Sequence, residues 1–123
     1  MTRTLILLLL IAALATGCKP AAPSPDFDIQ GRITDILPGD GQYKDFLGTI
    51  RIEGEPVTST SYDKAVVTVT RSTRMWKKSG EGYVAATWDD LKFGALVQAK
   101  FTGPVRESYP VQADAAEIVI LGQ

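Results

Sequence analysis

The stretch "KAVVTVTRST", residues 64–73, alternates apolar and polar side chains with a period of two residues. In an extended chain Ala65, Val67 and Val69 share one face, while the residues between them point to the other. β-branched residues dominate the stretch, and these favour strands over helices. The pattern therefore predicts a strand that buries one face in a core.

The same alternation recurs on both sides of this strand. Segments 27–36, 46–55, 94–103 and 115–122 repeat it, and turn residues in "LPGDGQ", residues 37–42, separate the first two. Gly31 indicates a bulge or a bend in the first segment. In the last segment the predicted faces are Ala116, Ile118 and Ile120 against Glu117, Val119 and Leu121.

One short stretch breaks the all-β pattern. In "TWDDLKFG", residues 87–94, Thr87 or Asp89 can cap a short helix that ends at Gly94, so a helical turn is predicted near Asp89–Phe93. Five strands with one short helix between the third and the fourth predict a small barrel of the OB type. The fold class is mainly all-β, and the barrel is expected to be a single domain over residues 27–123.

The N-terminus has the order of parts found in an exported protein. Arg3 precedes an apolar run of 11 residues, 5–15, which is too short to span a bilayer but suits a signal peptide. Small residues then lead to Cys18, the only cysteine of the chain. This order resembles the lipobox of bacterial lipoproteins, which implies cleavage after residue 17 and lipidation of Cys18.

The residues after Cys18 predict where the protein resides. Residues 18–26 include three prolines and are expected to form an extended tether. Lys19 stands where aspartate would retain a Gram-negative lipoprotein in the inner membrane, which favours the outer membrane, facing the periplasm. In a cell with one membrane, the outer face of that membrane is expected. Loss of residues 1–17 removes Arg3 and changes the formal charge from −1 to −2.

The C-terminal half resembles a known family. The matching features are a strand ending in Thr73, the run "DLKFG" at residues 90–94, and "ESYPVQA" at residues 107–113 before a closing strand. These features are similar to those of the YobA-like family of small bacterial lipoproteins. The resemblance implies an OB-like barrel and lipoprotein status, and it implies no biochemical activity, because none is established for that family.

Composition removes several kinds of catalytic site. The chain has no histidine, which excludes Ser-His-Asp and Cys-His nucleophile systems and His-containing zinc sites. The sequence "SYDK", from Ser61 to Lys64, fits the S-x-x-K pattern but lacks the other motifs of that chemistry. Neighbouring Asp89 and Asp90 diverge rather than face one substrate bond. We therefore expect no cofactor, no metal and no enzyme, with a carboxylate- or Lys-dependent envelope hydrolase as the alternative.

A second group of carboxylates lies in a predicted turn. Asp35, Asp40 and Asp45 are spaced differently from a Ca²⁺-binding loop, so a Gly- and Asp-rich turn is the prediction.

One segment suggests binding. "RSTRMWKKSG" sets four basic residues around one aromatic, a combination with which OB barrels hold single strands or sugars. The same residues could rest on anionic headgroups. The alternative is a solvated hairpin whose Trp packs across the barrel mouth. We add Tyr109, an aromatic residue outside this segment, to the candidate surface. The surface then consists of Arg71, Arg74, Trp76, Lys77, Lys78 and Tyr109.

Tyr109 has two competing interpretations. Pro110 biases it toward an extended conformation, and we expect its ring to be partly buried with its hydroxyl bonded to backbone. The competing view makes it an exposed contact for a ligand. Taken together, the sequence predicts a monomeric, lipid-anchored, extracytoplasmic protein that binds a small ligand or an envelope protein, and no nucleic acid.

Overall fold

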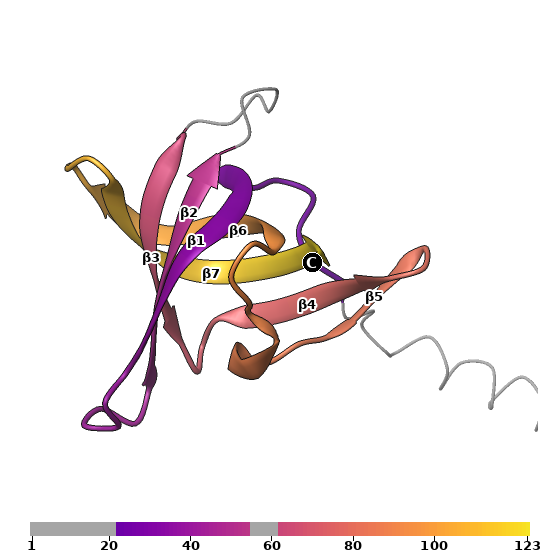
Figure 1. Ribbon diagram of the computed structural model, residues 1–123, viewed down its shortest axis with the longest axis horizontal. Helices are drawn as coiled ribbons and strands as arrows, with labels where there is room; N and C mark the ends of the chain where they lie inside the picture. The colour runs from indigo at the N-terminus through magenta and orange to yellow at the C-terminus, as the bar shows by residue number, and fades with distance from the viewer. Residues whose placement is uncertain (1–21, 55–61) are drawn as a thin grey trace, which may run out of the picture.

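A computed structural model describes residues 22–54 and 62–123 and consists almost entirely of strands (Figure 1). The predictions for Cys18, Lys19 and Ser61 concern residues outside these ranges. Among the described residues no helix is long or apolar enough to span a membrane. The strands are β1 (Ile29–Pro38), β2 (Phe46–Gly54), β3 (Lys64–Thr70), β4 (Arg74–Ser79), β5 (Gly82–Ala85), β6 (Leu96–Arg106) and β7 (Val111–Gly122).

Five of the strands close into a barrel. β2 pairs with β1 and β3, β6 pairs with β1 and β7, and a parallel pairing of β3 with β7 closes the ring. This is the OB-like barrel that the sequence predicts. The two further strands, β4 and β5, form a hairpin that extends away from the barrel (Figure 1). β4 pairs in parallel with β7.

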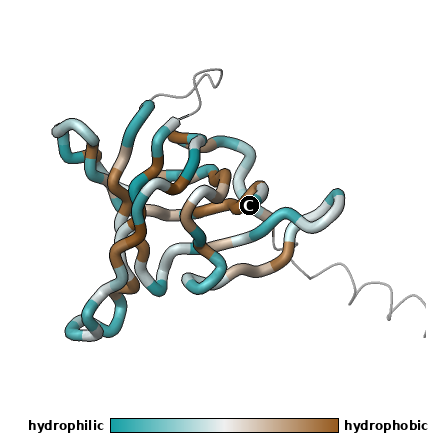
Figure 2. Tube along the Cα trace, viewed as in Figure 1, coloured by the Kyte–Doolittle hydropathy of each residue, from teal (hydrophilic) through white to brown (hydrophobic). Residues whose placement is uncertain are grey.

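The core consists of the alternating positions that the sequence indicates. Ala65, Val67 and Val69 are fully buried, and Figure 2 shows the hydrophobic positions concentrated along the barrel strands. Other fully buried members of this cluster are Ile29, Ile33, Ile50, Ile52, Val97, Ala99 and Ile118. These side chains fill the interior of the barrel, as expected of a small barrel.

Two details of strand geometry differ from the prediction. The irregularity in β1 lies between Ile33 and Asp35, not at Gly31. Gly31 is needed because a Cβ there would overlap with the backbone carbonyl of Glu53. In β7, Lys100 pairs with Glu117 and Phe101 with Ala115, which leaves Ala116 as an extra residue. This bulge changes the alternation, so Ala116 does not share the buried face of Ile118.

The helical turn is shorter and earlier than predicted. It is a 3₁₀ turn, η1 (Trp88–Asp90), with Thr87 as its N-cap. The backbone N–H of Thr87 donates to Asp90 Oδ2 at 2.8 Å. Trp88 packs against the core and close to Gly48, where a Cβ would lie 2.5 Å from the indole ring.

Candidate functional site

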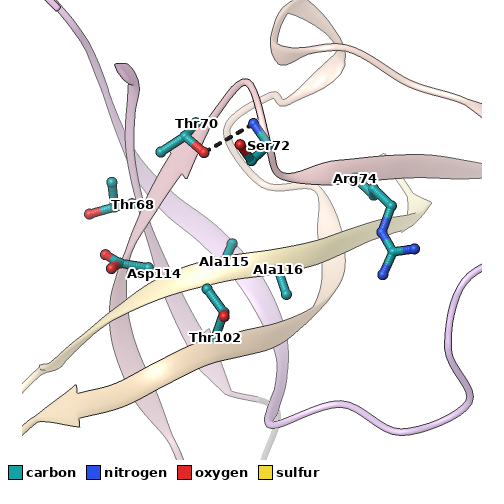
Figure 3. Close-up of a pocket in the computed structure, with 8 residues that line it drawn as sticks. All are labelled: Thr68, Thr70, Ser72, Arg74, Thr102, Asp114, Ala115 and Ala116. Carbon is teal, nitrogen blue, oxygen red and sulfur yellow. Dashed lines mark hydrogen bonds between the residues drawn. The ribbon is translucent and has the colours of Figure 1, made fainter. Parts of the chain in front are cut away.

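The described surface has an open cleft where β3 separates from β7 and β4 takes its place. Its volume is about 390 Å³. Thr68 and Asp114 are register partners at one end, and Arg74 lies at the other end (Figure 3). The lining residues are Thr68, Thr70, Ser72, Arg74, Thr102, Asp114, Ala115 and Ala116. We call this surface the β3–β4 cleft.

Thr73 holds the strands together below this cleft. Its buried hydroxyl donates to the backbone carbonyl of Ala115 at 2.9 Å and accepts from the backbone N–H of Thr70 at 3.0 Å. The hydroxyl therefore satisfies backbone groups that a continuous β3–β7 ladder would otherwise pair. In the turn above it, the N–H of Ser72 donates to Thr70 Oγ1 at 3.2 Å (Figure 3). The prediction that the strand ends in Thr73 was wrong by three residues, because β3 ends at Thr70.

The chemistry of the cleft is that of hydroxyl groups with one charge at each end. Thr68, Thr70, Ser72 and Thr102 offer hydroxyls that both donate and accept hydrogen bonds. Arg106 lies 3.5 Å from Asp114 and partly neutralises its carboxylate. Such a lining suits a small polar molecule or the polar side chains of another protein.

The structure divides the predicted binding surface into separate parts. Arg71 lies in the turn after β3, where its backbone N–H donates to the backbone carbonyl of Asp45 at 2.9 Å. Lys77 lies 3.4 Å from Asp90 of η1, whereas Lys78 is exposed. Arg74 alone of the predicted residues lines the β3–β4 cleft.

Trp76 is not an exposed stacking platform, because only 7% of its surface is accessible. It pairs with Val119 of β7, and the guanidinium of Arg74 lies 5.9 Å from its ring centre. Met75 packs against the core, so Trp76 points to the opposite, outward face of the sheet. The prediction of a hairpin is therefore confirmed, but its Trp packs on the outer face and not across the barrel mouth.

The prediction of a partly buried Tyr109 was wrong. The side chain is 68% exposed, and its hydroxyl donates to Asp63 Oδ2 at 3.0 Å rather than to backbone. The ammonium of Lys64 lies 5.6 Å from the centre of its ring. Tyr109 precedes β7, whereas the basic hairpin pairs with the second half of that strand, so the two do not form one surface.

The acidic candidates are engaged in local contacts. The hydrogen bond from Thr87, with the nearby charge of Lys77, holds the pKa of Asp90 below its ordinary value. Asp40 accepts from the backbone N–H of Gln42 at 2.9 Å, as in an Asx turn. Within residues 22–54 and 62–123, no three acidic or cysteine side chains gather where they could hold a metal ion.

Sequence reasoning missed one buried carboxylate. The alternation predicts that Glu117 and Val119 share the face opposite Ile118 but not that this face is covered, and both are buried, at 4% and 5% exposure. The cause is the segment before β1, residues 22–28, which we call the N-terminal strap. The N–H of Ser24 donates to Glu117 Oε1 at 3.2 Å, and Arg74 lies 3.8 Å from the same oxygen.

The fold and the cleft define a small OB-like barrel protein with a polar surface site. Comparison with known proteins adds no relative: no family model, no curated protein and no solved structure matches the chain. The function must therefore be inferred from the residues and their arrangement.

Proposed function

We propose that the protein is a lipid-anchored, extracytoplasmic binding protein of the cell envelope. In this proposal Cys18 bears the lipid, and Lys19 directs a Gram-negative lipoprotein to the outer membrane. The similarity to the YobA-like lipoproteins supports the anchor and adds no activity. The ligand is a small polar molecule or a polar segment of an envelope protein.

The observation that supports binding most directly is the β3–β4 cleft. Because side chains fill the barrel interior, a ligand must bind on the outer surface. The cleft has a volume of about 390 Å³, within the range of ligand sites, roughly 300–1,000 Å³. Its hydroxyl lining can bond to a partner without burying an unpaired charge.

Two measurements test this proposal separately. The first replaces Cys18 with serine and follows the protein through membrane fractionation. We expect Cys18→Ser to leave the membrane fraction or to remain unprocessed. A variant that stays on the membrane at mature size would contradict the lipid anchor.

The second measurement tests the cleft in living cells. A photo-crosslinking amino acid replaces Thr102, which lines the cleft, and in a matched strain replaces Gln42, an exposed residue of the β1–β2 turn. We expect specific adducts at position 102 that are absent at position 42, and mass spectrometry identifies them. Equal adducts at both positions, or none at position 102, would contradict a binding role for the cleft.

A further inference from the structure

The N-terminal strap runs across the outward face of β6 and β7. Lys100 lies 3.2 Å from the carboxylate of Asp26, and this hydrogen-bonded contact lowers the pKa of Asp26. The N–H of Phe101 donates to Asp28 Oδ2 at 2.8 Å. Together with the bond between Ser24 and Glu117, these contacts fix the path of the chain up to its first described residues.

The same face continues onto the β4–β5 hairpin. Side chains alternate along β4, so Arg74 and Lys78 point to the same side as the outward-facing Trp76. Lys78 pairs across the hairpin with Tyr83, which is 41% exposed. Because Trp76 is buried, the accessible part of this surface consists of two basic residues, one tyrosine and Ala85, the exposed register partner of Trp76. We call Arg74, Lys78 and Tyr83 the hairpin face.

The strap brings the predicted anchor close to this face. Ala22, the first described residue, follows Cys18 by four positions, and a fully extended chain of that length reaches at most about 14 Å. Pro23 and Ser24 line one pocket with Glu117 and Val119, which are the register partners of Arg74 and Trp76 in β4. The predicted tether over residues 18–26 does not separate the barrel from the anchor along its whole length, because Pro23, Ser24 and Asp26 lie against the barrel.

We propose that the hairpin face rests on a membrane surface that contains anionic phospholipids, with the strap holding it there. The proposal rests on the lipid anchor at Cys18. Arginine and lysine attract anionic headgroups, and tyrosine is favoured at the interface between headgroups and acyl chains. Two carboxylates reduce the net attraction: Glu81 lies in the turn of the hairpin, and Glu117 lies 3.8 Å from the Arg74 guanidinium. Within the described residues, Lys78 is therefore the basic residue of this face that has no ion pair.

The test uses the full chain, purified from membranes and reconstituted into vesicles. Because Cys18 is the only cysteine, Tyr83→Cys introduces the single free thiol once Cys18 is lipidated. Tyr43→Cys, in the β1–β2 turn on the other side of the molecule, is the matched control (Figure 1). The rate of labelling by a membrane-impermeant maleimide is measured in detergent, in phosphatidylcholine vesicles and in vesicles with phosphatidylglycerol.

We expect phosphatidylglycerol vesicles to slow labelling at position 83 at least fivefold relative to detergent and to leave position 43 within twofold. A second substitution, Lys78→Gln, should weaken this protection by up to about fivefold, as for the loss of one charge near an anionic surface. Lys44→Gln, an exposed control, should not change it. Equal labelling at positions 83 and 43 would overturn the proposal while the lipid on Cys18, detected by mass spectrometry, remains. A chain without that lipid would overturn the anchor and this proposal together.

Discussion

Around Asp114 the outward face of β7 lies open in the β3–β4 cleft, whereas around Val119 the same face is covered by the N-terminal strap. The open part is lined by threonine, serine and aspartate. Water can hydrogen-bond to these side chains, so their exposure carries no desolvation penalty. The covered part has a valine and a tryptophan, Trp76, on a face that would otherwise meet water. One strand thus has two outer surfaces with different chemistry.

Because side chains fill the barrel interior, the two parts of β7 differ only in what lies on the outer surface. Burial of Trp76 and Val119 adds a small apolar layer outside the core, and the strap is needed to complete it. The cleft has no such cover, so its polar groups are available to a partner. We infer that the covered part serves stability and the open part serves recognition, a division that four substitutions can test.

The largest effect is expected from Trp76→Ala. If the covered part is a true packed layer, removal of this side chain should lower the free energy of unfolding by about 3–5 kcal/mol, as for a core aromatic. Chemical denaturation of a chain that begins at residue 22 measures the change. Tyr83→Ala, on the same face but exposed, should cost less than about 0.5 kcal/mol. Equal costs for the two would show that this face is not packed.

The next effect concerns the floor of the open part. Thr73→Val keeps the shape of the side chain but removes the hydroxyl that bonds Ala115 and Thr70. Two backbone groups lose a buried partner, so we expect a loss of about 1–3 kcal/mol in the same denaturation experiment. Thr102→Val, on the rim of the cleft, should change stability by less than about 0.5 kcal/mol. If Thr73→Val matched this control, the bridging role of Thr73 would be excluded.

A smaller effect is expected where the strap is fastened. Ser24→Pro removes the N–H that donates to Glu117, whereas Ser24→Ala retains it. We expect the proline variant to be less stable than the alanine variant by about 1 kcal/mol, the value of one hydrogen bond. Limited proteolysis should also cut the strap of the proline variant sooner. Indistinguishable variants would mean that the strap is held by its other contacts.

The smallest effect depends on pH. The pKa of Asp26 is lowered in the folded protein by Lys100, so the charged carboxylate stabilises the fold above its unfolded pKa near 3.8. This contribution is lost as the pH falls through the lower, folded pKa. Asp26→Asn should therefore be slightly less stable than the parent at pH 7, and the difference should shrink as the pH falls below the unfolded pKa and through the folded one. A difference that persisted in acid would have a cause other than this ion pair.

The sequence predicts the barrel well because the core is built from local alternation. The positions of Ala65, Val67 and Val69 follow from a period of two residues, and the helical turn follows from a capping residue at Thr87. Such signals lie within a few residues of one another, so they can be recognised without the fold.

The candidate site could not be predicted in the same way. The cleft combines residues of β3, β6 and β7 that only the closed barrel brings together. The burial of Glu117 could not be predicted, because nothing near it in the sequence indicates that Ser24 will lie over it. The bulge at Ala116 is likewise set by the pairing of β7 with β6. Tyr109 can donate to Asp63 only because the parallel pairing of β3 with β7 brings the two residues together.

The position of β7 in the barrel has a consequence for how the chain matures. β7 follows β3, β4 and β6 in the chain, yet all three bond to it. Its pairings with β3 and β4 join residues about 45 positions apart, so they form only after a large loss of chain entropy. Until its 12 residues emerge, β3 has an unpaired edge that can bond to other chains. We therefore expect the barrel to close only after β7 has been synthesised, and deletion of β7 to cause aggregation.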